Sequence, residues 1–149
     1  LLAALLAASL QPDAATGLAV MLAAVGLYNA TRDWRLVPVA GIAFLASIIA
    51  GLRGELPAQP FVERVLVDLA LQQPLAALGL GASLIAAFLL FAHALPAEMR
   101  VRHALAGSLF GFSLAAIVSN YPSVLIGYGA APIIGYGLAL ALADHTPSG

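Results

Sequence analysis

Long apolar stretches, separated by short clusters of charged residues, form the dominant pattern along the chain. A charge at the centre of a bilayer costs at least about 2.5 kcal/mol even on lenient insertion scales, so charged clusters mark the ends of membrane crossings. One crossing takes about 20 predominantly apolar residues in a helix. The pattern therefore predicts membrane-spanning helices at 14–31, 36–52, 74–95, 103–120 and 122–143.

The first stretch of the chain, residues 1–10, is also apolar but is short. As a helix it would extend about 15 Å, which is half of a membrane crossing. We interpret it as the end of a sixth span, with a signal-peptide remnant as the alternative. The expected fold is an all-α integral membrane protein, in which residues 1–149 form a single polytopic bundle of five to six transmembrane helices.

The segment 61–73 has a different pattern, which is that of a short amphipathic helix. Its apolar side chains share one helical face, whereas Glu63, Arg64 and Asp68 lie elsewhere. A helix with such a pattern lies in the membrane interface. A simple turn that leads into Pro74, and a docking element for a partner, are the alternatives.

The composition supports the membrane class. The chain is 62% hydrophobic and 9% charged, whereas a soluble domain is about 45–50% apolar and about 25% charged. A net charge of −1 without a basic run gives no electrostatic basis for nucleic-acid binding. The absence of cysteine excludes disulfides and thiolate metal sites.

The distribution of arginine predicts the orientation of the helices. The connections 32–35 and 95–102 fall on one face of the bundle and carry four arginines, against Arg53 and Arg64 on the other face. Arginine-rich short loops are cytoplasmic. We therefore expect a protein of a bacterial-type inner (plasma) membrane whose C-terminus is cytoplasmic.

Small residues recur at four-residue steps in the last two predicted spans. Lipid tails are as apolar as leucine, so helices in a membrane associate through close backbone approach, which small residues permit. These stripes predict helix-packing positions. They are Gly107, Gly111 and Ala115 in one span, and Gly127, Ala131 and Gly135 in the next.

The last predicted span also contains two Gly-Tyr-Gly sequences on either side of Pro132, which is expected to kink the helix. The eight-residue offset places Tyr128 and Tyr136 on nearly the same face. These three residues are candidates for lining a site for a quinone, a pigment or a lipid tail. In the alternative, Tyr128 belongs to an interfacial aromatic belt and Tyr136 packs against a neighbouring helix.

No recognisable catalytic or phosphate-binding motif occurs in the sequence. His93 and His103 lie near the cytoplasmic ends of adjacent predicted spans, and they are the weak candidates for a metal or haem ligand. Because they lack carboxylate partners, we expect no metal and no obligatory cofactor. Lipid, quinone or pigment remain the candidate ligands.

The hypothesis that these features favour is a non-catalytic subunit or scaffold of a larger membrane complex. Its partners would be the lipid bilayer and either other membrane subunits or a second copy of the chain. A passive carrier or half-transporter for a neutral or hydrophobic solute is one alternative. The other is a membrane enzyme with a His/Arg site at the cytoplasmic edge, which would use Arg100 or Arg102.

Overall fold

The computed structural model describes residues 14–52, 65–118 and 130–143. This part of the chain is 91% helix and contains no strand, so the all-α fold class is confirmed for it. The elements are α2 (Ala14–Thr31), α3 (Leu36–Leu52), α4 (Val65–Gln72), α5 (Pro74–Leu89), the π-helical segment η1 (Leu90–Ala94), α6 (Met99–Val118) and α7 (Ala130–Ala143).

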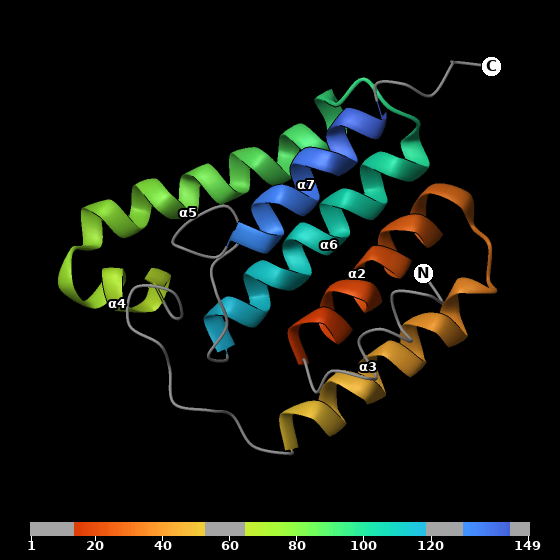
Figure 1. The fold of residues 1–149 in the computed structure, drawn as a ribbon, viewed down its shortest axis with the longest axis horizontal. Helices are drawn as coiled ribbons and strands as arrows, with labels where there is room; N and C mark the ends of the chain where they lie inside the picture. Colours follow the sequence, from red (N-terminus) through yellow and green to blue (C-terminus); the bar gives the residue numbers. More distant parts are fainter. Residues whose placement is uncertain (1–13, 53–64, 119–129, 144–149) are drawn as a thin grey trace.

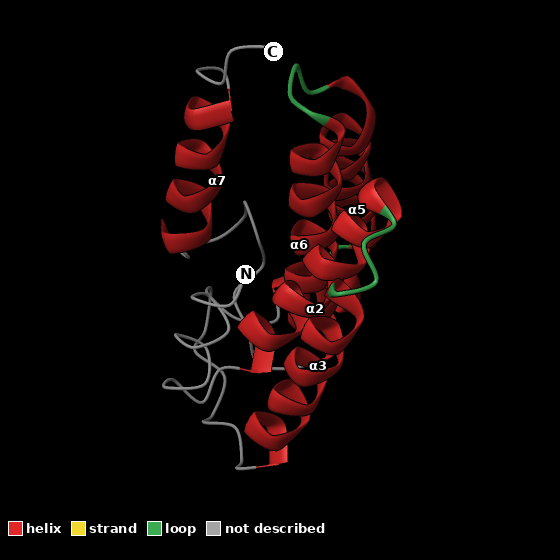
Figure 2. Cartoon of the chain, turned by 90° about the vertical axis from the view of Figure 1, so that its right-hand side faces the viewer, coloured by secondary structure: helices red, strands yellow, loops and turns green. Residues whose placement is uncertain are grey.

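Four of the helices lie side by side in one layer, in the order α3, α2, α6, α5 (Figure 1). The helix α7 stands on one face of this layer (Figure 2). The most extensive helix contacts are those of α2 with α6 and with α3. The helix α6 contacts η1 more extensively than it contacts α5 itself. The centre of the fold is therefore α2 with its two neighbours, and α5 is less closely attached.

A tight connection makes α2 and α3 antiparallel. The backbone N–H of Asp33 donates to Thr31 Oγ1 at 3.2 Å, and the Asp33 carboxylate accepts the backbone N–H of Arg35 at 3.0 Å. Arg32 has a φ of 56° and donates its N–H to the Tyr28 carbonyl at 2.7 Å. This is a left-handed cap that ends α2.

A proline sets the end of η1, which continues α5. Leu95 precedes Pro96 and has extended backbone angles, because the proline ring excludes the helical conformation from the residue before it. The last hydrogen bond before this point joins the N–H of Leu95 to the Leu90 carbonyl at 2.9 Å, which is the i to i−5 pattern of a π-helix. The connection to α6 therefore needs only a few residues.

The helix α6 begins at Met99, four residues before the predicted span 103–120. The N–H of Arg102 donates to the Glu98 carbonyl at 3.0 Å, so the two arginines of this region lie within the helix. Charged side chains mark a membrane edge, but they do not end a helix, since long side chains reach back to the interface. This explains the difference from the boundary predicted by charge.

The amphipathic segment predicted at 61–73 contains α4, while 61–64 lie outside the described residues. Its Val67 and Leu69 are partly buried, and Leu71 is 80% exposed. Gln73 is not helical, with φ −142° and ψ 76°, because Pro74 disfavours the helical conformation in the residue before it, and this break separates α4 from α5. In Figure 1, α4 turns away from the axis of α5 at the beginning of that helix.

Three of the described helical stretches are long and apolar enough to cross a membrane: Ala14–Thr31, Pro74–Ala94 and Met99–Val118. The apolar helix α3 has 17 residues, and α7 has 14 in its described part. Large apolar side chains are exposed along α3 and α5, including Phe44, Ile49, Leu78 and Ile85. Such an apolar surface is stable in lipid and unfavourable in water.

Candidate functional site

Two glycines of α6 bring its backbone into direct contact with α2. A Cβ atom added to Gly107 would overlap the carbonyl oxygen of Leu22. A Cβ atom at Gly111 would lie 2.6 Å from Ala19 Cα and 2.9 Å from the carbonyl oxygen of Leu18. Both separations are shorter than real Cβ contacts, so no side chain larger than hydrogen fits at either position without a shift of the helices.

The helix α2 supplies further glycines to its contacts. A Cβ atom at Gly26 would overlap the carbonyl oxygen of His103 on α6, and one at Gly17 would lie 3.0 Å from Ser47 Cβ on α3. The Ser47 hydroxyl donates to the Ala14 carbonyl at 2.6 Å. These contacts show that the N-terminal end of α2 lies beside α3, and that its C-terminal end lies beside the start of α6.

Gly17 and Gly26 were not predicted as packing residues. The sequence nevertheless contains a pattern that indicates close packing of their helix, since small residues recur there at four-residue steps. These residues are Ala15, Ala19 and Ala23, and all are buried.

The predicted packing residues of the last two spans have different surroundings. Ala115 is 3% exposed on α6. No described atom lies within 4 Å of a Cβ atom added to Gly135. Gly127 lies outside the described residues, and Ala131 belongs to the first turn of α7, where its side chain is not described. Close packing at Gly135 therefore remains a proposal and needs a neighbour other than the described helices.

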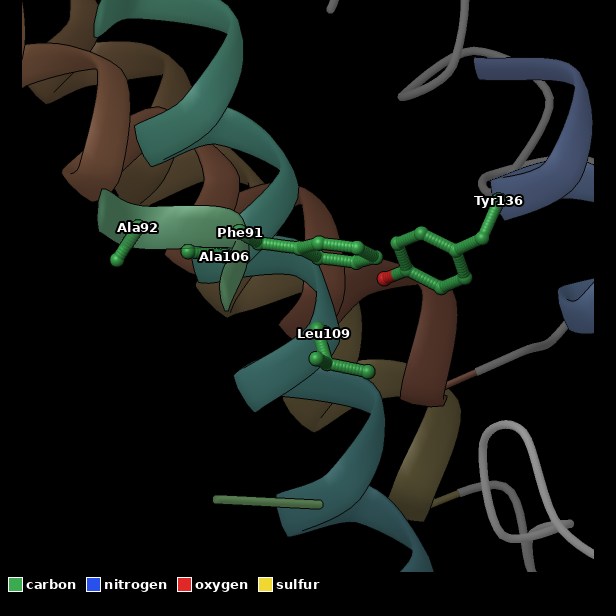
Figure 3. Packing of buried hydrophobic residues seen from close by; sticks show 5 residues of the cluster. All are labelled: Phe91, Ala92, Ala106, Leu109 and Tyr136. Carbon is green, nitrogen blue, oxygen red and sulfur yellow. The ribbon is translucent and has the colours of Figure 1, made fainter. Parts of the chain in front are cut away.

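Tyr136 joins α7 to the helical layer. Its side chain is 7% exposed, and its hydroxyl lies 2.8 Å from the hydroxyl of Ser108 on α6. The centroid of its ring is 5.6 Å from that of Phe91 in η1. Figure 3 shows the two rings side by side, with Leu109 below them. The arrangement is one of helix packing with one buried hydrogen bond between hydroxyl groups.

The side chains of the other two candidate ligand-lining residues are not described by the structure. Tyr128 lies outside the described residues. Pro132 is the third described residue of α7. A kink upstream of Pro132 would lie at residues that are not described.

The two candidate histidines lie near the end of the bundle that carries the connections 32–35 and 95–98 (Figure 1). The carbonyl of His93 accepts a hydrogen bond from Arg102 Nη1 at 3.2 Å. The Nδ1 of His103 lies 2.8 Å from the Met99 carbonyl of its own helix, to which it donates. Within the described ranges, no group of three or more His, Asp or Glu side chains is placed to hold a metal.

An apolar groove of about 380 Å³ lies between α5 and α6. The rings of Phe88 and Phe110 stand with centroids 6.0 Å apart at this groove. Ser113 is the polar side chain among its lining residues. The groove is lined by Gly81, Leu84, Ile85 and Phe88 of α5 and by Leu109, Phe110, Ser113 and Ile117 of α6. This lining suits a hydrocarbon chain and offers almost nothing to a polar solute.

Comparison with protein-family models, with curated proteins and with solved structures found no match to the chain. The class of the protein therefore follows from the described helices alone. Three apolar helices of membrane-spanning length and a largely apolar exposed surface indicate an integral membrane protein.

Proposed function

We propose that the chain is a non-catalytic integral membrane subunit that packs into a larger membrane assembly. The observation that carries this proposal is the contrast between the close-packed centre and the open outer helices. Gly107 and Gly111 are in backbone contact with α2, whereas Gly79 and Gly81 of α5 have no described atom within 4 Å of an added Cβ.

The energetic cost of glycine in a helix explains why this contrast indicates a missing partner helix. Glycine inside a helix is less favourable than alanine by about 1 kcal/mol, and in a membrane helix the compensation comes from close approach of a second backbone. Gly79 has no such compensation from the described chain, whereas Gly81 lines the groove between α5 and α6. A helix of another subunit, or of a second copy, would supply it.

The exposure of α5 supports the same proposal. Only 11% of the most apolar 18-residue window of Pro74–Ala94 is buried, against 33% for Ala14–Thr31. The helices α2, α3, α5 and α7 carry no charged side chain, so these parts of the chain hold no group that relays protons or binds an ion. These features favour a role in assembly over the carrier and enzyme alternatives.

Photo-crosslinking in native membranes tests the proposal. A photoreactive residue replaces Leu78, which is 70% exposed on α5, and the matched control replaces Leu109, which is 1% exposed on α6. We expect the variant at Leu78 to give a protein adduct heavier than the 15.1 kDa chain, and the control to give none. Equal absence of protein adducts from both positions, with both variants present in the membrane, would contradict the proposal.

A further inference from the structure

Arg102 carries a positive charge that no described carboxylate balances. It lies in the first turn of α6 and is half-buried. Its Nη1 donates to the neutral carbonyl of His93, and its Nε is buried without a hydrogen-bond partner among the described residues. A buried N–H of a cation without an acceptor is unfavourable, and an anion close to the guanidinium would stabilise it.

The nearby carboxylates are engaged elsewhere. Glu98 pairs with Arg100 at 3.3 Å, in the one ion pair found among the described residues. Asp33 accepts the backbone N–H of Arg35 in the connection between α2 and α3. This end of the bundle therefore keeps an excess of positive charge, and Arg102 is its half-buried member at the junction of η1 with α6.

Arg102 lies on the same face of α6 as two of the residues that line the apolar groove between α5 and α6. Leu109 and Ser113, which line the groove, follow Arg102 by seven and eleven residues, and both offsets return to within about 20° of the same direction on a helix. Phe110 lies about 12 Å from Arg102 along the axis at 1.5 Å per residue. This separation is within the half-thickness of the hydrocarbon core, which is about 15 Å.

We propose that Arg102 and this groove form a binding site for one anionic phospholipid. The phosphate lies at the Arg102 guanidinium, and one acyl chain follows α6 into the part of the groove at Leu109, Phe110 and Ser113. A basic site between helices at one membrane edge is a known way of holding anionic headgroups. The two halves of the site fit the two halves of such a lipid, which a free anion or a neutral lipid does not match.

This site does not depend on the proposed role in a larger assembly, because it lies within one chain. The two proposals can therefore fail separately. The crosslinking experiment reports on protein neighbours in the membrane, whereas the lipid site is tested on the purified chain.

Native mass spectrometry of the purified full chain tests the lipid site. The protein is equilibrated in mild detergent with equal amounts of phosphatidylglycerol and phosphatidylcholine, and in a parallel sample with excess inorganic phosphate. We expect one phosphatidylglycerol to be retained in preference to phosphatidylcholine, and inorganic phosphate not to displace it. Equal retention of the two lipids, or full displacement by phosphate, would overturn the proposal.

Two pairs of variants separate the headgroup from the acyl chain. Arg102→Gln should lower phosphatidylglycerol retention about tenfold, as expected for a lost charge-assisted hydrogen bond. Arg100→Gln, at a side chain that is 65% exposed, should leave retention unchanged. Gly81→Leu adds a side chain in the groove and should lower the retention of the lipid. Gly79→Leu should not, because Gly79 does not line the groove, although an added Cβ there also has no described atom within 4 Å.

If Arg102→Gln does not fold, the comparison of Gly81→Leu with Gly79→Leu still tests the lipid site. Both of these variants add the same side chain to the same helix. Circular dichroism verifies that the compared variants are helical. Equal lipid retention by Gly81→Leu and Gly79→Leu would overturn the placement of the acyl chain. Equal retention by folded Arg102→Gln and Arg100→Gln would overturn the placement of the phosphate.

Discussion

Glycine residues determine how closely α2 and α6 approach each other. Gly107 and Gly111 were predicted from their four-residue spacing, and the structure places both against the backbone of α2. Gly135 has the same spacing pattern in the sequence but no described neighbour. The spacing identifies a helix face that consists of small residues, but it does not show whether a second helix packs against that face.

The glycine contacts predict a difference between two identical substitutions. Gly111→Leu should lower the free energy of unfolding by about 1–3 kcal/mol, because a side chain there pushes two backbones apart. Gly135→Leu, at a site with no described atom within 4 Å, should leave the stability of the isolated chain nearly unchanged. Thermal unfolding in detergent measures both. Equal unfolding temperatures for the two variants would show that the α2–α6 contact does not limit stability.

The hydroxyl pair predicts a measurable coupling between α6 and α7. Tyr136→Phe and Ser108→Ala each remove one partner of the 2.8 Å hydrogen bond. Hydrogen bonds of this kind in membrane proteins average about 0.6 kcal/mol, with a maximum near 1.7 kcal/mol. A double-mutant cycle in detergent should give a coupling energy in this range. A coupling energy of zero would mean that the ring packing alone holds Tyr136.

At the scale of helices, much of the secondary structure could be predicted from charge and hydropathy. The helices α2 and α3 have the bounds of the predicted segments 14–31 and 36–52. The start of α6 was placed too late, because arginines at a membrane edge stay within the helix. The pairing of α2 with α6 was not predictable, since several helices are rich in small residues and their stripes do not specify a partner.

The helix directions predict a labelling pattern. The connections at Asp33 and Ala97 lie at one end of the layer, and Gln73 lies at the other, as Figure 1 shows. Since the chain has no cysteine, single-cysteine variants at these positions report on one site each. A membrane-impermeant maleimide should label Asp33→Cys and Ala97→Cys from the same side of the membrane.

The variant Gln73→Cys tests the opposite end of the layer in the same experiment. Gln73→Cys should react from the opposite side, and the arginine excess predicts that Asp33→Cys and Ala97→Cys face the cytoplasm. Labelling of all three from the same side in intact cells would contradict both the crossing pattern and the orientation.

For the whole molecule, the described helices form an open layer with α7 on one face (Figure 2). Large apolar side chains are exposed along α3 and α5. A lipid-facing surface needs no small residues, yet Gly41 and Gly51 of α3 and Gly79 and Gly81 of α5 have no described atom within 4 Å of an added Cβ. The count of five to six membrane crossings stays a prediction, since three helices of spanning length lie among the described residues. The partner of these faces could not be predicted from the sequence, because it depends on the surface of another chain.

The protein mass of the complex extracted from native membranes in a gentle detergent tests this account most directly. Light scattering, corrected for bound detergent, gives the mass of protein alone. We predict a mass of at least twice the 15.1 kDa of the chain, with either a second copy or other membrane proteins present. A single species of 15.1 kDa that retains transport or catalytic activity would contradict the account and favour a carrier or an enzyme.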